Sequence, residues 1–300
     1  DVAVYGVDRR FQNAGQVTSS GWEFKADYDV IKNDKLSYET GLILYNNKVV
    51  LDEFSNELAQ YGFLGSPGQN AVTMVRVKVG DKLGNIYGPV FQGVNADGSP
   101  QFEDVTGDGT LNTDSGNVLQ DDYDGRVLGT AYPTLEMSWS NVVEFGDGWT
   151  LNAFFRGAFG HSLINTFRAF YEPNVPSQTS YNQMNTSLRE PNLAVAQYSS
   201  LYVEKADFFL LDNLTLSKQI FFPEGSGIKD LTVSLNALRP FVITSYTGTD
   251  PSPELFDALG GGEEGVEAGS DGAALLAPGI DRRQDYFASK TFSIGLSVNF

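Results

Sequence analysis

Apolar and polar side chains alternate along much of this chain, and the alternation is strictest in its last segment. Residues 291–300 read TFSIGLSVNF, and Phe292, Ile294 and Phe300 are among the apolar residues at every second position. Successive side chains of a β-strand point to opposite faces, so this period of two predicts a strand with one apolar and one polar face. A tilted strand needs about ten residues to cross a bilayer, and the segment has that length.

The same alternation recurs upstream in segments of similar length. Within residues 21–31, Trp22 and Phe24 share one face, whereas Glu23 and Lys25 share the other. We therefore predict an all-β fold of consecutive antiparallel strands. The other segments with this period are residues 35–45, 135–143, 149–159, 231–237 and, less regularly, 208–220.

Short and long links alternate between these segments. The short links lie at about 32–34, 145–148 and 223–227, and the long links at about 51–70, 95–130, 161–201 and 247–286. Outer-membrane barrels have short periplasmic turns and long extracellular loops. If Phe300 ends in the periplasm, counting strands backward places every short link there and every long link outside. The count holds for seven strands, or for nine if residues 71–79 and 85–94 also cross instead of forming an extracellular hairpin.

A sheet that spans a membrane must close into a barrel, because lipid cannot satisfy the hydrogen bonds of its edges. Charged residues such as Asp27 and Arg156 then line the lumen, and the apolar face contacts hydrocarbon. A secreted β-sandwich hydrolase would also show alternation. It would not explain the long terminal strand or the regular order of short and long links. We predict a transmembrane antiparallel β-barrel with long extracellular loops, of which this chain is the C-terminal portion. The long loops favour a large barrel of about 22 strands.

Composition narrows the possible functions. The net charge of −18 argues against binding to nucleic acid, whose phosphates require basic side chains. Without cysteine, the chain has no disulfide and no Cys-ligated metal site. His161 is the single histidine, and no nucleophile motif accompanies it. Acidic pairs such as Asp121 and Asp122 are interpreted as a solvated loop rather than a glycosidase pair. We predict no catalytic residues and no enzyme activity.

One loop has the composition of a calcium site. Residues 104–114 read DVTGDGTLNTD, with oxygen-bearing residues at alternate positions and Gly109 at the sharp turn, as in an EF-hand loop. Ser115 holds the position of the usual bidentate glutamate, so Asp114 or Asp121 would have to complete the site. A polar turn without an ion is the alternative. The predicted Ca²⁺ ligands are Asp104, Thr106, Asp108, the Thr110 carbonyl, Asn112 and Asp114.

Longer motifs occur along the chain in a fixed order. Residues 13–23 read NAGQVTSSGWE, residues 79–93 VGDKLGNIYGPVFQG, residues 202–217 YVEKADFFLLDNLTLS and residues 236–251 NALRPFVITSYTGTDP. With the Asp/Gly loop and the last strand, they resemble the C-terminal signatures of SusC-like TonB-dependent transporters. The chain departs from the family pattern at Phe209 and Leu211, at residues 252–254, and in an insertion at 260–272.

The resemblance implies a role for the whole of residues 1–300. They would form a C-terminal segment of the transporter barrel in the bacterial outer membrane, without the N-terminal plug and the first strands. Such proteins import oligosaccharides, peptides or other large nutrients together with a SusD-like surface lipoprotein. The missing N-terminal region would carry the contact with TonB. A non-transport outer-membrane barrel, such as a surface adhesin anchor, is the alternative.

Aromatic residues in the long loops are candidates for contact with sugars, with the lipoprotein or with one another. They are Phe167, Phe170, Tyr171, Tyr181 and Tyr198. Because the pattern favours none of these roles, we assign no substrate-binding residue.

Overall fold

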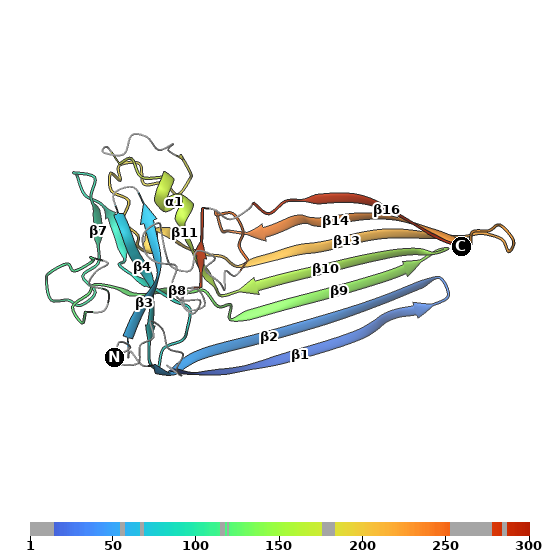
Figure 1. Ribbon diagram of the computed structural model, residues 1–300, viewed down its shortest axis with the longest axis horizontal. Helices are drawn as coiled ribbons and strands as arrows, with labels where there is room; N and C mark the ends of the chain where they lie inside the picture. The colour runs from blue at the N-terminus through green and yellow to red at the C-terminus, as the bar shows by residue number, and fades with distance from the viewer. Residues whose placement is uncertain are drawn as a thin grey trace, which may run out of the picture.

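The fold, taken from a computed structural model, consists of a long sheet with a smaller domain at one end (Figure 1). We call the sheet the wall and the smaller part the loop domain. The structure describes residues 15–54, 58–66, 69–114, 118, 120–175, 184–252, 278–283 and 287–300.

The wall is a seven-stranded sheet in which every neighbouring pair of strands is antiparallel. Strands that follow one another along the chain, once the loop domain is left out, are also neighbours in the sheet. This confirms the predicted run of consecutive antiparallel strands. In order across the sheet they are β1 (Gly15–Asn33), β2 (Leu36–Phe54), β9 (Leu135–Phe145), β10 (Trp149–Phe159), β13 (Phe208–Phe221), β14 (Asp230–Thr244) and β16 (Thr291–Asn299).

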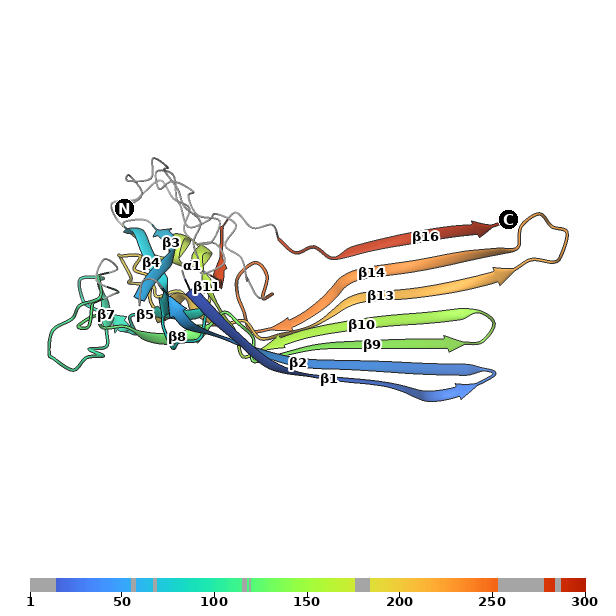
Figure 2. The ribbon, with the colours of Figure 1, turned by 60° about the horizontal axis from the view of Figure 1, so that its bottom comes forward.

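Short and long links lie at opposite ends of the wall. The turns from β1 to β2, β9 to β10 and β13 to β14 gather at one end, where β16 also finishes, and the loop domain lies at the other (Figures 1 and 2). The predicted separation of the links is therefore confirmed. Residues 71–79 and 85–94 belong to the loop domain, so the wall has seven strands and not nine.

The register of the strands places apolar residues in rows on one face. Leu216 of β13 lies opposite Leu235 of β14, which lies opposite Ile294 of β16. The next row is polar, with Asn236 opposite Ser293. Leu235 is 52% exposed and Ile294 74% exposed. Apolar surface left in water costs about 25 cal/mol per Å², so these rows indicate a face that contacts hydrocarbon.

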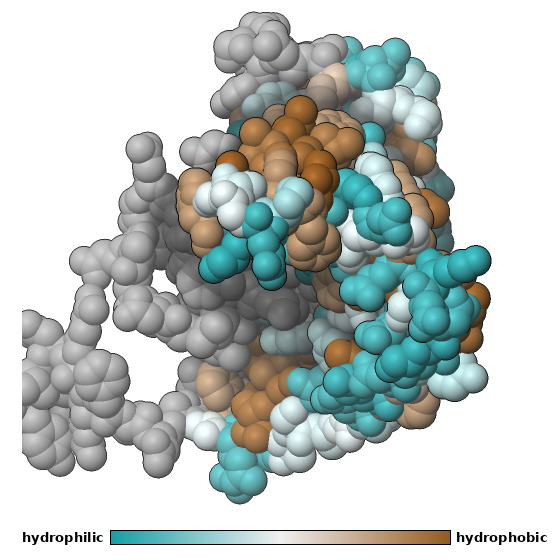
Figure 3. All heavy atoms as spheres, turned by 90° about the vertical axis from the view of Figure 1, so that its right-hand side faces the viewer, coloured by the Kyte–Doolittle hydropathy of each residue, from teal (hydrophilic) through white to brown (hydrophobic). Residues whose placement is uncertain are grey.

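Viewed from the end with the short turns, hydrophobic and hydrophilic residues lie side by side along the sheet (Figure 3). At this end Trp149 stacks on Phe145, with ring centroids 6.4 Å apart, and the Lys218 ammonium lies 5.5 Å from the Trp149 ring. Aromatic residues beside a cation are typical of the boundary between lipid and water. No helix among the described residues is long and apolar enough to cross a membrane.

A β-bulge explains why residues 208–220 alternate less regularly than the other segments. Between Leu211 and Asn213 the pairing of β13 with β14 shifts by one residue, and the pairing with β10 shifts at the same place. A bulge opposes two residues of one strand to one of its partner, which breaks the period of two. Relative to β10 the extra residue is Asp212, which forms an ion pair with Arg156 of that strand, at 2.9 Å.

The loop domain is built from the long links and has a hydrophobic core of its own. Met74, Ile86, Ile164 and Tyr202 come from four different elements and are each at most 1% exposed. One sheet contains β3 (Leu58–Ser66), β4 (Gln69–Lys78), β5 (Asn85–Gly88) and β8 (Arg126–Thr130), and a second contains β12 (Val203–Lys205), β11 (Ser162–Asn165) and β15 (Ile280–Asp281). The remaining elements are β6 (Phe91–Val94), β7 (Pro100–Phe102), α1 (Thr166–Tyr171) and the 3-10 helix η3 (Ser200–Tyr202).

Candidate functional site

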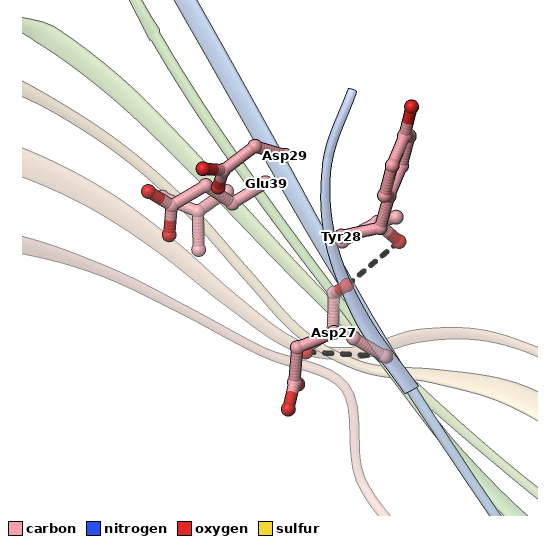
Figure 4. A pocket seen from close by; sticks show the side chains of 8 residues that line it. Asp27, Tyr28, Asp29 and Glu39 are labelled. Carbon is pink, nitrogen blue, oxygen red and sulfur yellow. Dashed lines mark hydrogen bonds between the residues drawn. The ribbon is translucent and has the colours of Figure 1, made fainter. Parts of the chain in front are cut away.

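The polar face of the wall is hollowed between β1, β2 and β9. The hollow is lined by Asp27 and Asp29 of β1, Glu39 and Gly41 of β2, and Ser140 of β9. The register groups them, because Asp27 lies opposite Gly41 and Gly41 lies opposite Ser140. In Figure 4 the carboxylates of Asp29 and Glu39 project to the same side of the strands.

Gly41 keeps this hollow open. A Cβ atom at position 41 would lie 2.7 Å from both Asp27 Oδ1 and Ser140 Oγ, which is closer than atoms pack. Lys25 is the basic neighbour of the acidic residues, with its Nζ 3.1 Å from Asp27 Oδ2 in an exposed ion pair. Exposed pairs contribute little energy, so the carboxylates stay accessible to groups that donate hydrogen bonds.

Two further side-chain pairs join neighbouring strands of the wall. The Tyr45 hydroxyl of β2 donates to Glu136 Oε2 of β9, at 2.7 Å. Arg156 of β10 holds Asp212 of β13 through two parallel hydrogen bonds of 2.9 and 3.2 Å. Such paired groups offer fixed donors and acceptors, which suits reversible contact with a polar solute.

Helix α1 anchors the loop domain through charges that point inward. The Arg168 and Glu172 side chains are each 3% exposed, and Arg168 Nε lies 2.9 Å from Glu172 Oε1. Arg168 Nη1 lies 3.0 Å from Glu204 Oε1, and its guanidinium also donates to the carbonyls of Leu188 and Leu201. Burial alone would lower the pKa of Arg168, but Glu172 and Glu204 raise it above its usual value. The buried Arg168 side chain therefore connects α1 with other segments of the loop domain.

The other side of α1 carries aromatic rings. Phe170 and Tyr171 lie edge to face with ring centroids 4.9 Å apart, and Phe167 lies 6.2 Å from Phe287. The Arg283 guanidinium lies 3.6 Å from the centre of the Phe170 ring. Three of the predicted loop aromatics thus form one cluster. Tyr198 is instead buried in the core of the loop domain, and Tyr181 lies outside the described residues.

The predicted calcium loop folds around two carboxylates. Asp104 accepts hydrogen bonds from the backbone N–H groups of Gly107 and Gly109, at 2.6 and 2.9 Å. Asp124, which the sequence reasoning missed, accepts bonds from the backbone N–H groups of Thr106 and Asn112. Its position in an acidic run gave no sign that it is fully buried.

Asp108, another predicted ligand, forms hydrogen bonds within its own turn. Asp108 accepts from the N–H and hydroxyl of its neighbour Thr110, at 2.8 and 2.6 Å. Among the described residues, no three or more Asp, Glu or His side chains gather in a way suited to a metal ion. Ser115 lies outside those residues. Calcium binding by Asp104, Thr106, Asp108, Thr110, Asn112 and Asp114 stays a prediction.

The chain is similar in sequence to two TonB-dependent receptors. No model of a known protein family matches the chain. TonB-dependent receptor P3 of Formosa agariphila is 22% identical over 268 residues, which are 82% of this chain and 26% of that protein. TonB-dependent receptor P26 of the same organism is 22% identical over 328 residues, covering 98% of this chain and 30% of that protein.

Solved structures share the fold. The RagAB peptide importer in its closed-closed state aligns with a TM-score of 0.70 at 18% identity, over 99% of this chain and 31% of that chain. The chain resembles SusC-like TonB-dependent transporters. The predicted resemblance and the predicted barrel fold are both confirmed. The open-open state of RagAB aligns with a TM-score of 0.65, again at 18% identity, over 99% of this chain and 30% of that chain.

The resemblance to TonB-dependent transporters explains why the wall has one apolar and one polar face. In such a barrel the apolar rows face lipid and the polar rows, with Asp27, Glu39 and Arg156, face the lumen. The chain spans between 26% and 31% of the length of these relatives and structural neighbours. Their names are those of receptors and importers, in keeping with the predicted absence of enzyme activity.

Proposed function

We propose that this chain is the C-terminal part of a transporter barrel that imports large nutrients across the bacterial outer membrane in a TonB-dependent manner. The observation that carries the proposal is a wall with one exposed apolar face, one polar face, and a folded loop domain at one end. The apolar face holds the protein in lipid, the polar face lines a path for solutes, and the loop domain contacts the nutrient outside. The N-terminal plug and the first strands would lie in the rest of the full-length protein.

The proposed partners are a SusD-like lipoprotein outside the cell and TonB, which would act on the N-terminal region. The exposed Phe287 beside α1 supports a contact surface on the loop domain. The proposed cargo is an oligosaccharide or a peptide. The likeness to the RagAB peptide importer supports peptides, and the hollow at Asp27, Asp29 and Glu39 suits ligands rich in hydrogen-bond donors.

Uptake in living cells tests this function. The full-length gene would be deleted, and the mutant compared with a complemented strain for uptake of labelled oligosaccharides and peptides. We expect uptake of at least one compound to be lost on deletion, restored by the gene, and lost again when TonB is removed. Deletion of the neighbouring lipoprotein gene is expected to reduce the same uptake.

Two results would contradict the proposal. Uptake that needs the gene but not TonB would exclude energised import. Unchanged uptake of every compound, together with loss of cell adhesion, would favour the adhesin anchor that the sequence pattern also allows.

A further inference from the structure

A second hollow, of about 460 Å³, lies where the wall meets the loop domain. Its lining comes from the ends of β10 and β13 and from several links of the loop domain, so it forms only when these are folded together. Unlike the hollow on the polar face, it contains basic side chains. The polar and charged side chains of its lining include Lys82, Asn85, Thr130, His161, Lys205 and Asp207.

His161 contributes a buried atom that lacks a partner. The side chain is 1% exposed, and its Nε2 lies 2.8 Å from the carbonyl oxygen of Pro251. A carbonyl only accepts hydrogen bonds, so Nε2 carries the proton and Nδ1 is the free acceptor of the neutral ring. Nδ1 is buried without a hydrogen-bond partner among the described residues.

The neutral form of His161 is the one favoured in the fold. Burial lowers the pKa of His161, whereas the Pro251 carbonyl, Asp207 and Glu136 act in the opposite direction without reversing the shift. A buried acceptor with no donor is destabilising, typically by about 1–3 kcal/mol. Because His161 is one of the residues that line the hollow, its buried, unpartnered acceptor points to a ligand that donates a hydrogen bond there.

Lys82 and Lys205 add positive charge to the lining of the hollow. Within the described part of the chain, neither Lys82 nor Lys205 has a carboxylate partner within ion-pair distance. Both lysines are exposed, and they bring two positive charges to the lining of one hollow in a protein with 38 acidic and 20 basic residues. Asp207, the acidic residue of the lining, already accepts the backbone N–H of Gly160, at 2.6 Å.

We propose that this hollow binds an oxyanion group, a carboxylate or a phosphate, on a ligand that also carries a hydroxyl or amide donor. Lys82 and Lys205 hold the oxyanion, and His161 Nδ1 accepts the hydrogen bond of the neighbouring donor. An acidic sugar combines these groups, and so does the phosphorylated headgroup of an outer-leaflet glycolipid. If the ligand is a nutrient, the inference rests on the proposed import function and names its substrates as acidic.

Ligand-observed NMR titration of the full-length receptor in detergent tests the site. One arm uses galacturonate with galactose as its uncharged match, and the other uses lipopolysaccharide with its dephosphorylated form. We expect the charged member of at least one pair to bind better than its match by about tenfold or more. Binding of galacturonate identifies a soluble acidic ligand, and binding of lipopolysaccharide alone identifies a headgroup.

Variants separate the site from general charge and folding effects. Lys82→Ala with Lys205→Ala is expected to weaken this binding by about tenfold or more, whereas Lys35→Ala with Lys218→Ala, which removes two charges at the far end of the wall, leaves it unchanged. His161→Gln keeps an N–H for the Pro251 carbonyl but removes the Nδ1 acceptor. It is expected to weaken binding by about tenfold with an unchanged melting temperature.

Equal binding of the charged and uncharged probes would overturn the proposal. So would binding that the lysine double variant leaves intact. Neither result depends on transport, because binding is measured on purified protein. Loss of TonB-dependent uptake with intact galacturonate binding would instead contradict only the import function.

Discussion

The wall and the loop domain place their apolar residues in opposite surroundings. In the wall, Leu235 and Ile294 are exposed in apolar rows, and no layer of the described residues covers them. In the loop domain, Met74 and Tyr202 lie in a dry core, and even the charges of Arg168 are buried. The wall is stabilised by contact of its apolar rows with the hydrocarbon of the membrane. The loop domain is stabilised by the apolar side chains packed in its own core. Changes of residue should therefore act differently in the two regions.

The largest effect is expected from Arg168→Met in the loop domain. The substitution leaves Glu172 and Glu204 buried without their cation, and breaking a buried pair typically costs about 3–5 kcal/mol. Hydrogen exchange on the full-length receptor should show lost protection across the loop domain while the wall strands stay protected.

An exposed ion pair of the same domain provides the control. Arg126 lies 3.2 Å from Glu103, and its side chain is more than half exposed. Arg126→Met should change loop protection little, because exposed pairs contribute about 1 kcal/mol or less. Equal effects of the two substitutions would refute the central role of the Arg168 cluster.

A smaller effect is expected in the wall from Ile294→Arg. A basic residue on the lipid-facing side near the middle of the bilayer costs roughly 2–4 kcal/mol. Urea unfolding of the receptor in lipid vesicles should show this loss of stability. Ser293→Arg, one position away on the polar face, should be nearly neutral, and a loss as large as that of Ile294→Arg would contradict the assignment of the faces.

A pH effect of smaller size is expected at the junction of the two regions. The pKa of His161 is lowered in the folded state, so the unfolded chain binds the proton more strongly. The neutral His161 ring therefore contributes its full stability above the ordinary histidine pKa of about 6.5. This stability is lost as the pH falls through the pKa of His161 in the folded state. Melting curves between pH 7.5 and 5 should show a steeper decline for the native receptor than for His161→Gln, and parallel declines would exclude this role.

The smallest effect is expected from calcium at residues 104–114. If the predicted ligands bind the ion, adding Ca²⁺ should slow proteolysis within this loop and leave the wall unaffected. Asp108→Asn should weaken the protection, because it removes a charge while keeping an acceptor for Thr110. Identical cleavage with Ca²⁺ and with a chelator would identify the loop as a polar turn.

The wall was predictable because its rule is local. Each strand carries its own period of two, so Phe292 and Ile294 reveal their face without knowledge of any partner. The alternation is less regular at the bulge around Asp212, where the pairing of β13 shifts against both of its neighbouring strands. The sequence also did not decide whether residues 71–79 and 85–94 cross the membrane. Short strands that cross and short strands of an extracellular hairpin have similar sequence patterns.

The loop domain and its sites were less predictable because they depend on contacts between distant links. Arg168 meets Glu204 across 36 positions, and no sequence pattern relates them. Asp124 closes the Asp104 loop from outside the motif that drew attention to it. His161 follows a strand and enters a loop, which indicates exposure, yet the folded links bury it.

The most direct test of the two-faced wall uses the absence of cysteine from this chain. Single cysteines at positions 292 to 297 of β16, in the full-length receptor in native membranes, would be treated with a water-soluble maleimide. We expect cysteines that replace Ser293, Gly295 and Ser297 to react, and cysteines that replace Phe292, Ile294 and Leu296 to be protected. Uniform reaction or uniform protection along the strand would contradict a sheet with lipid on one face and water on the other.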